Sequence, residues 1–108
     1  MSLKILQINF NYNVPTADYE RAVGPLADPI AAVRGLHWKT WLVNDTRREA
    51  GGIYLFDDDA SLQAYLAGPI VAGIKTNPAL SNLSAKVFDV MPTPSAITRA
   101  PLRQAVPV

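Results

Sequence analysis

Apolar side chains on both faces of the predicted strands constrain the fold of this chain more than any other feature. The segments 3–12 (LKILQINFNY), 36–43 (LHWKTWLV) and 49–56 (EAGGIYLF) each combine strand-forming residues with apolar residues at odd and at even positions. Successive side chains of a strand point to opposite sides of the sheet. Both faces of the predicted sheet are therefore expected to be buried.

A helix over 17–33 is predicted after the first strand. Apolar residues recur there at helical spacing, and Thr16 is placed to cap the helix start. Pro25 and Pro29 each remove a backbone donor and clash with the preceding turn, so they predict a kink or a break. Two interpretations stay open: a helix that curves over a twisted sheet, or a bend that opens a cavity beneath it.

The remaining elements complete a β-α-β-β-α-β order. Turn-forming residues at 44–48 join the second and third strands into a hairpin, and the carboxylates of 57–59 favour a helix over 60–67. A short helix over 70–75 and a last strand over 83–90 follow. This order predicts an α+β, ferredoxin-like βαββαβ fold with a four-stranded antiparallel sheet.

Prolines mark a boundary near the end of the chain. The segment 92–108 contains four prolines spaced among apolar residues. Proline restricts the backbone and lacks an amide donor, so this pattern predicts an extended arm and not a core element. We expect one domain over 1–91 and a proline-rich C-terminal arm over 92–108.

The second face of the sheet needs a cover. Two helical segments can cover only one face of a four-stranded sheet. A two-fold related copy of the same sheet is the simplest cover for the other apolar face, so we expect a face-to-face homodimer.

Composition excludes several kinds of site. The chain of 108 residues has no cysteine, which removes disulfides, thiolate metal sites and iron–sulfur clusters, and its single histidine gives no metal-ligand cluster. A formal net charge of +1 argues against nucleic-acid binding. No apolar run is long enough to span a membrane and the start lacks the features of a signal peptide, so a cytoplasmic location is expected.

A glycine pair, Gly51-Gly52, interrupts the third strand. It lacks the following glycine and helix of a dinucleotide-binding loop. The pair is expected to allow a bulge, or the close approach of a side chain or ligand to the backbone.

The densest group of aromatic and hydrogen-bonding side chains lies on neighbouring strands. Its members are Asn9, His37, Trp38, Lys39, Trp41, Tyr54 and Phe56. Trp38 and Trp41 are three residues apart and so point to opposite sheet faces, which leaves at least one of them for packing.

The polar members of this group each have two interpretations. His37 is a candidate proton acceptor, because histidine titrates near neutral pH, or a structural residue. Asn9 is a candidate catalytic or ligand-contacting residue, or a hydrogen-bonded core group. Lys39 can hold an anionic substrate, or it can be an ordinary solvated lysine.

Five segments carry a family resemblance: 36–41 (LHWKTW), 49–56 (EAGGIYLF), 85–90 (AKVFDV), 5–10 (ILQINF) and 25–27 (PLA). They resemble the YdhR-like mono-oxygenases of the dimeric α/β-barrel (antibiotic-biosynthesis mono-oxygenase-like) superfamily. The resemblance implies a ferredoxin-like fold, a homodimeric barrel, and a pocket in each subunit between the sheet and the helices.

The resemblance also implies a function. The superfamily includes oxygenases that use neither metal nor flavin, so we expect a cofactor-independent mono-oxygenase that oxidises a small aromatic or polyketide-like compound with dioxygen. Trp38, Tyr54 and Phe56 would form walls of the pocket. Asn9 would orient the substrate, and Lys39 would pair with its anion.

Two other functions stay open: a non-catalytic module that binds a small apolar or aromatic ligand, and an isomerase or decarboxylase on the same scaffold. Haem-degrading members of the superfamily carry a ligating histidine on a helix, whereas the single histidine of this chain lies on a predicted strand. His37 replaces a variable apolar residue of the family, so a catalytic role for it would be peculiar to this protein.

Overall fold

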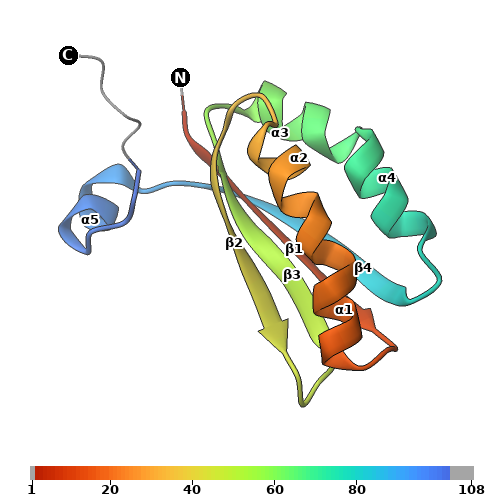
Figure 1. The fold of residues 1–108 in the computed structure, drawn as a ribbon. Helices are drawn as coiled ribbons and strands as arrows, with labels where there is room; N and C mark the ends of the chain where they lie inside the picture. The colour runs from red at the N-terminus through yellow and green to blue at the C-terminus, as the bar shows by residue number, and fades with distance from the viewer. Residues whose placement is uncertain (1, 103–108) are drawn as a thin grey trace.

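Four antiparallel strands form one sheet in the order β2-β3-β1-β4. The computed structural model describes residues 2–102. In chain order the elements are β1 (Lys4–Tyr12), α1 (Thr16–Val23), η1 (Gly24–Leu26), α2 (Ala27–Ala31), β2 (Leu36–Asn44), β3 (Glu49–Phe56), α3 (Asp59–Leu66), α4 (Pro69–Thr76), β4 (Leu80–Asp89) and α5 (Pro92–Ile97). Helices α1 to α4 lie together on one face of the sheet (Figure 1). The ferredoxin-like α+β fold predicted from the sequence is confirmed.

The central strand β1 shows how the helix side of the sheet becomes the core. Leu6, Ile8, Phe10 and Tyr12 alternate along this strand, and each is at most 5% exposed. Tyr12 stacks on Tyr19 of α1 with ring centroids 4.7 Å apart. Burying each such side chain contributes roughly 1.5–3 kcal/mol. The residues that the sequence places together on one side of the first strand therefore form the side that packs against the helices.

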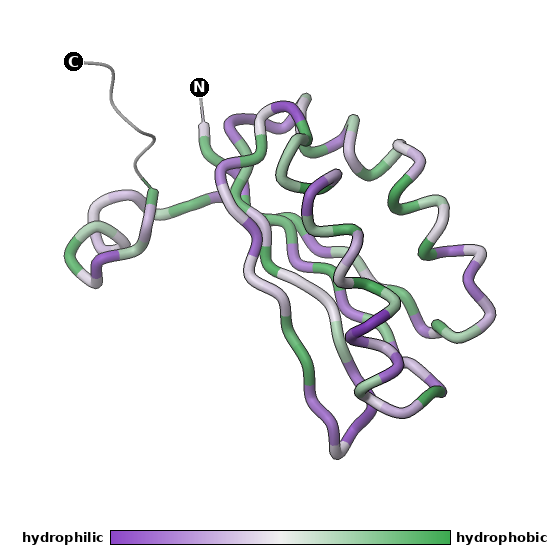
Figure 2. The backbone as a smooth tube through the Cα atoms, viewed as in Figure 1, coloured by the Kyte–Doolittle hydropathy of each residue, from purple (hydrophilic) through white to green (hydrophobic). Residues whose placement is uncertain are grey.

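The register of the predicted hairpin decides which side chains face the helices. Lys39 pairs with Tyr54, and Trp41 pairs with Gly52. Because Tyr54 belongs to the buried row on the helix side, Lys39 and Trp41 lie on that side and Trp38 lies on the opposite side. The turn that joins the two strands is strongly hydrophilic (Figure 2), as its sequence predicts.

An extra residue interrupts this register at the start of β2. Leu36 pairs with Phe56, and Trp38 pairs with Leu55. The chain therefore advances by two residues on β2 while it advances by one on β3. His37 is the additional residue, and such bulges bend a strand and redirect a side chain.

Prolines break the predicted long helix into three pieces. Pro25 lies in the short 3-10 helix η1, and Pro29 lies in α2. The break follows from the missing amide donor and the steric clash of each proline, and this expectation is confirmed. Within residues 2–102, no helix has the length and apolar character that crossing a membrane requires.

The predicted cap of the first helix is wrong. Pro15 is the residue before the helix, and Thr16 is already inside it. The Thr16 hydroxyl lies 2.6 Å from Tyr12 Oη and also donates to the Asp45 carboxylate. It therefore ties the helix start to the sheet instead of capping the helix amides.

The later elements agree with the predicted order. The Asp58 carboxylate accepts a hydrogen bond from the Ser61 amide at 2.9 Å, which caps α3 as the acidic run suggests. The last strand, β4, begins at Leu80 and not at residue 83.

The C-terminal arm is not extended where the structure describes it. Residues Pro92–Ile97 form helix α5, because prolines are tolerated in the first turn, where their missing amides have no helical partner. The arm then returns to β2, where Trp38 Nε1 donates to the Pro101 carbonyl at 2.7 Å. The boundary between a domain over 1–91 and an arm over 92–108 stays a prediction, and 103–108 lie outside the described residues.

The sheet face opposite α1 to α4 carries apolar side chains. Ile5, Trp38, Leu42 and Ile53 are half-buried there, and Phe88 is 48% exposed. This face therefore carries apolar residues, as the two-sided strands predict, together with the polar Gln7, Asn9, Thr40 and Lys86.

Replacing Gly51 by alanine is expected to destabilise the fold by about 2 kcal/mol or more. Gly51 has φ +155°, and a Cβ there would lie 1.9 Å from the Ile8 carbonyl oxygen of β1. Urea unfolding measures the change. Gly24→Ala is the matched control, because a Cβ at Gly24 meets no heavy atom within 4 Å. Equal stabilities of the two variants would contradict this account of the β1–β3 contact.

Candidate functional site

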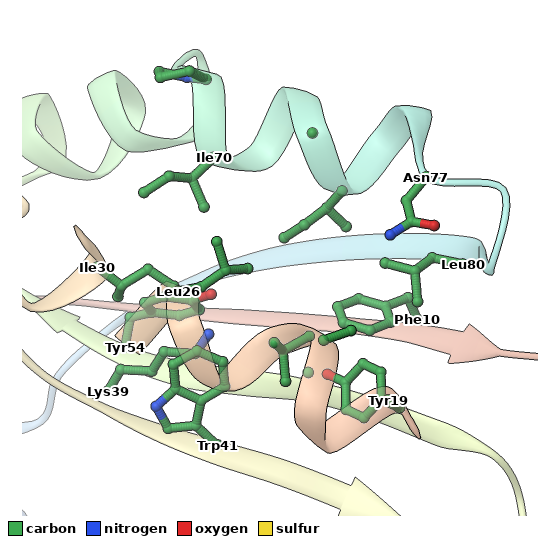
Figure 3. A pocket seen from close by; sticks show the side chains of 16 residues that line it. Phe10, Tyr19, Leu26, Ile30, Lys39, Trp41, Tyr54, Ile70, Asn77 and Leu80 are labelled. Atoms are coloured by element: carbon green, nitrogen blue, oxygen red, sulfur yellow. The ribbon is translucent and has the colours of Figure 1, made fainter. Parts of the chain in front are cut away.

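A cavity of about 430 Å³, called the large cavity below, lies between the sheet and helices α1, α2 and α4. Figure 3 shows its walls: strands contribute from one side and helices from the other. The labelled lining residues are Phe10, Tyr19, Leu26, Ile30, Lys39, Trp41, Tyr54, Ile70, Asn77 and Leu80.

Lys39 places a cation in this apolar cavity. Its Nζ lies 3.4 Å from the ring centroid of Trp41 and 4.7 Å from that of Tyr54. Both rings attract the cation through their electron-rich faces. Burial lowers the pKa of Lys39 to about 8, because the charged form loses hydration. Within residues 2–102 its side chain has no carboxylate partner and no hydrogen bond.

Gly52 makes room for this lysine. A Cβ at Gly52 would lie 2.4 Å from Lys39 Cε and 3.4 Å from Nζ. The Lys39 side chain therefore lies over Gly52 of β3, and any side chain at position 52 would occupy the same space. The expectation that the glycine pair admits a side chain close to the backbone is confirmed.

Tyrosines supply neutral hydroxyl groups around the cavity. The hydroxyl groups of Tyr54 and Tyr65 lie 3.0 Å apart in a hydrogen bond. Burial raises the pKa of Tyr19 to about 12 and also raises the pKa of Tyr54. These phenols stay protonated near neutral pH, so Lys39 carries the charge among the described lining residues.

Three of the residues predicted for the site line the large cavity: Lys39, Trp41 and Tyr54. Phe56 does not, because it is fully buried behind the cavity wall. Its ring packs against Tyr54 and Tyr65 with centroids 6.1 and 5.7 Å apart. Phe56 therefore supports the wall and does not form it.

Asn9 and Trp38 lie on the opposite face of the sheet and do not line this cavity, so a role for them in binding substrate stays a prediction. The Asn9 side-chain oxygen accepts a hydrogen bond from Gln7 Nε2 at 2.9 Å on the same face of β1. Trp38 instead binds the C-terminal arm through the Pro101 carbonyl. Strand alternation explains both positions: each residue is one step out of phase with the row that faces the helices.

His37 does not line the large cavity. Its Nε2 pairs with the Asp57 carboxylate, and its side chain is only 9% exposed. It borders a neighbouring cavity of about 320 Å³, which shares Ile30, Lys39 and Trp41 with the large one. This placement favours the structural interpretation of the histidine.

Several lining residues were not among the sequence candidates. Phe10, Tyr19, Ile30 and Ile74 line the cavity from the sheet and helices, and Asn77 adds a polar group at the end of α4. The apolar helical spacing in the sequence indicates that such residues face the sheet. It does not distinguish a cavity wall from packed core.

The fold and the cavity together define a ferredoxin-like domain with an aromatic pocket beneath its helices. A family model described as "Putative mono-oxygenase ydhR" matches residues 5–101, and the chain belongs to this family. No protein of curated function matches the chain.

Solved structures share the fold. A protein of unknown function from Nitrosomonas europaea is 24% identical and has a TM-score of 0.65, with 84% of this chain and 91% of that chain covered. SnoaB, a cofactor-independent oxygenase from Streptomyces nogalater, is 20% identical with a TM-score of 0.68, covering 83% and 94%. The heme-degrader MhuD from Mycobacterium tuberculosis, with two hemes bound in its active site, is 18% identical with a TM-score of 0.63, covering 81% and 95%.

Replacing Lys39 by methionine is expected to stabilise the folded protein at neutral pH. Burial lowers the pKa of Lys39 from 10.5 to about 8, so the folded protein binds this proton more weakly than the unfolded chain. The resulting cost to folding is full below pH 8 and disappears above pH 10.5. Lys39→Met should therefore raise the free energy of unfolding by about 1–3 kcal/mol at pH 7.

Urea unfolding of Lys39→Met and of the wild type at pH 7 and pH 10 measures this effect. Lys75→Met is the control, because Lys75 is exposed on α4 and outside the cavity lining. The same gain at both pH values would contradict a buried cation at Lys39.

Proposed function

We propose that this protein is a cofactor-independent mono-oxygenase that oxidises a small aromatic or polyketide-like compound in the large cavity. The cavity itself carries the proposal, because aromatic rings from β1, β2, β3 and α1 line it. Membership of a mono-oxygenase family supports an oxidation. The shared fold with SnoaB, a cofactor-independent oxygenase, supports one without a cofactor.

The dimensions of the cavity suit a small ring system. Its volume of about 430 Å³ lies within the roughly 300–1,000 Å³ of pockets that hold small molecules. Phe10, Tyr19, Trp41 and Tyr54 offer ring faces and edges on which an aromatic substrate can stack. Binding such a substrate displaces water, which protects a reactive intermediate.

The proposed reaction needs no external reductant. An ionised phenol or enol donates electrons to dioxygen, and the oxygen molecule bonds to a substrate carbon as a hydroperoxide. Cleavage of the O–O bond and loss of the remaining proton on that carbon leave a carbonyl group, and the second oxygen departs as water. The substrate loses two hydrogens and gains one oxygen, so atoms and electrons balance with dioxygen alone.

The lining residues do not fit a haem. The single histidine of the chain borders the neighbouring cavity and is paired with Asp57. Tyr19 and Tyr54 are poor anionic ligands for iron, because burial raises the pKa of both phenols. A haem-dependent reaction of the kind named for MhuD is therefore not proposed for this chain.

We also propose that two copies associate through the sheet face opposite α1 to α4. Ile5, Trp38, Leu42, Ile53 and Phe88 form an apolar surface there. A second sheet would bury this surface and favour association by roughly 25 cal/mol for each Å² removed from water. The cytoplasmic location expected from the sequence stays a prediction.

Oxygen uptake tests the proposed reaction. Purified protein is incubated aerobically with hydroxylated naphthalenes, without added metal or flavin, in an oxygen-electrode cell. Wild-type protein should consume oxygen in proportion to the quinone formed. Gly73→Leu should lose at least about tenfold in rate, because Gly73 lines the cavity and a side chain there meets open space.

Gly24→Leu is the matched control for Gly73→Leu, whose new side chain would fill part of the cavity. A side chain at Gly24 also meets open space, but Gly24 is not part of the cavity lining. Absence of oxygen uptake with every panel member that binds the wild type would rule out the oxygenase and favour a binding module. Full activity of Gly73→Leu would place the reaction outside this cavity.

Sedimentation at micromolar concentration tests the dimer. The wild type should sediment as a dimer and Ile53→Asp as a monomer, because the substitution buries a carboxylate in the proposed contact. Val43→Asp, on an exposed helix-side position of β2, should leave the dimer intact. A monomeric wild type would overturn the association.

A further inference from the structure

The Lys39 amine lies in the large cavity without an anion beside it. Its Nζ lies over the ring faces of Trp41 and Tyr54, 3.4 and 4.7 Å from their centroids. None of the described lining residues of this cavity is an aspartate or a glutamate. A poorly hydrated cation is costly unless an opposite charge is near. The site is therefore electrostatically incomplete until an anion enters it.

The other titratable groups around Lys39 do not supply that charge. Tyr54 on β3 and Tyr19 on α1 stay neutral, because burial raises the pKa of each phenol. Asp28 on α2 borders the neighbouring cavity, which Lys39 also lines, but it forms no ion pair with the amine, and burial alone accounts for the lowered pKa of Lys39. His37 on β2 is already paired with a carboxylate. Helix α4 adds no charged side chain to the described lining. An anion that enters from outside would meet no like charge in the large cavity.

We propose that the substrate is an aromatic compound bound as its phenolate or enolate, with the charged oxygen against Lys39 Nζ, and that Lys39 accepts the proton of that hydroxyl. The inference rests on the proposed mono-oxygenase function and assigns the ionisation of its substrate to Lys39. In this step the substrate O–H bond breaks and an N–H bond forms on the neutral amine. The electron pair stays on the oxygen, where it prepares the ring for dioxygen.

The acidity of Lys39 agrees with this role. Its pKa of about 8 keeps both forms of the amine available near neutral pH, which suits a group that exchanges a proton with a phenol. The ammonium form also binds a substrate that arrives already ionised. An opposite charge within about 4–6 Å commonly lowers the pKa of an acid by about 1 to 3.

Gly52 acts as a positioning residue for this proton acceptor. The Lys39 side chain needs the empty space over Gly52 to place Nζ between the rings of Trp41 and Tyr54. Gly52→Ala should displace the amine and weaken anion binding, while leaving the binding of a neutral ring compound nearly unchanged.

Anaerobic titration with 4-nitro-1-naphthol tests the inference apart from oxidation, because the ionised dye absorbs visible light. Bound to the wild type, the dye should ionise at a pH lower by about 1 or more than in free solution. Its uncharged analogue 1-nitronaphthalene, titrated by tryptophan fluorescence, should bind without pH dependence between pH 6 and 7.

Lys39→Met should weaken binding of the ionised dye about tenfold and abolish the displacement of its titration. The same variant should bind 1-nitronaphthalene as the wild type does. Lys39→Arg should keep tight binding of the ionised dye, because arginine remains cationic, but should lose oxygen uptake with un-ionised phenols at pH 6, because it accepts no proton.

Equal affinity of the wild type and Lys39→Met for the ionised dye would overturn the inference, and so would failure of the wild type to bind the dye. Oxygen uptake that persists in Lys39→Met would leave the mono-oxygenase in place and remove the lysine from it. Charge-dependent binding without any oxygen uptake would keep the anion site and rule out the oxygenase.

Discussion

The pairing of β2 with β3 is the constraint on which the site depends. Because Lys39 lies opposite Tyr54 and Trp41 lies opposite Gly52, both side chains of β2 point toward the helices. A slip of one residue would turn every side chain of the strand to the other face and bring Trp38 into the cavity in their place. One hairpin thus supplies the cation, the rings that hold it and the gap that admits it, and the helices supply apolar walls.

Much of this hairpin could be predicted from the sequence, because its signals are local. Strand formers, the hydrophilic turn and the two-residue alternation place Trp38 and Trp41 on opposite faces. The same alternation does not show which face meets the helices when both faces are apolar. For this reason the sequence could not indicate that Asn9 and Trp38 lie on the face away from the large cavity. Nor could it place Phe56 behind the cavity wall, because a residue behind the wall and one on it follow the same alternation.

Longer-range contacts account for what the sequence could not indicate. Pro25 and Pro29 predict the break between α1 and α2, but whether a broken helix leaves a void depends on how far it stands from the sheet. A bulge in β2 places His37 beside Asp57, which is 20 positions away, and no sequence motif predicts this bulge. Asn77 enters the lining because α4 ends beside β4, which is a property of the assembled fold.

The contact between Lys39 and Gly52 also makes two positions of the sequence interdependent. A protein of this fold with any side chain at the position of Gly52 has no room for the lysine as it lies here, since a single added carbon would lie 2.4 Å from Cε. A side chain at position 52 would therefore force the lysine into another conformation, and only a glycine there is compatible with the contact of Lys39 with the Trp41 and Tyr54 rings. The two positions are thus expected to vary together, which an alignment of related sequences can reveal without a structure.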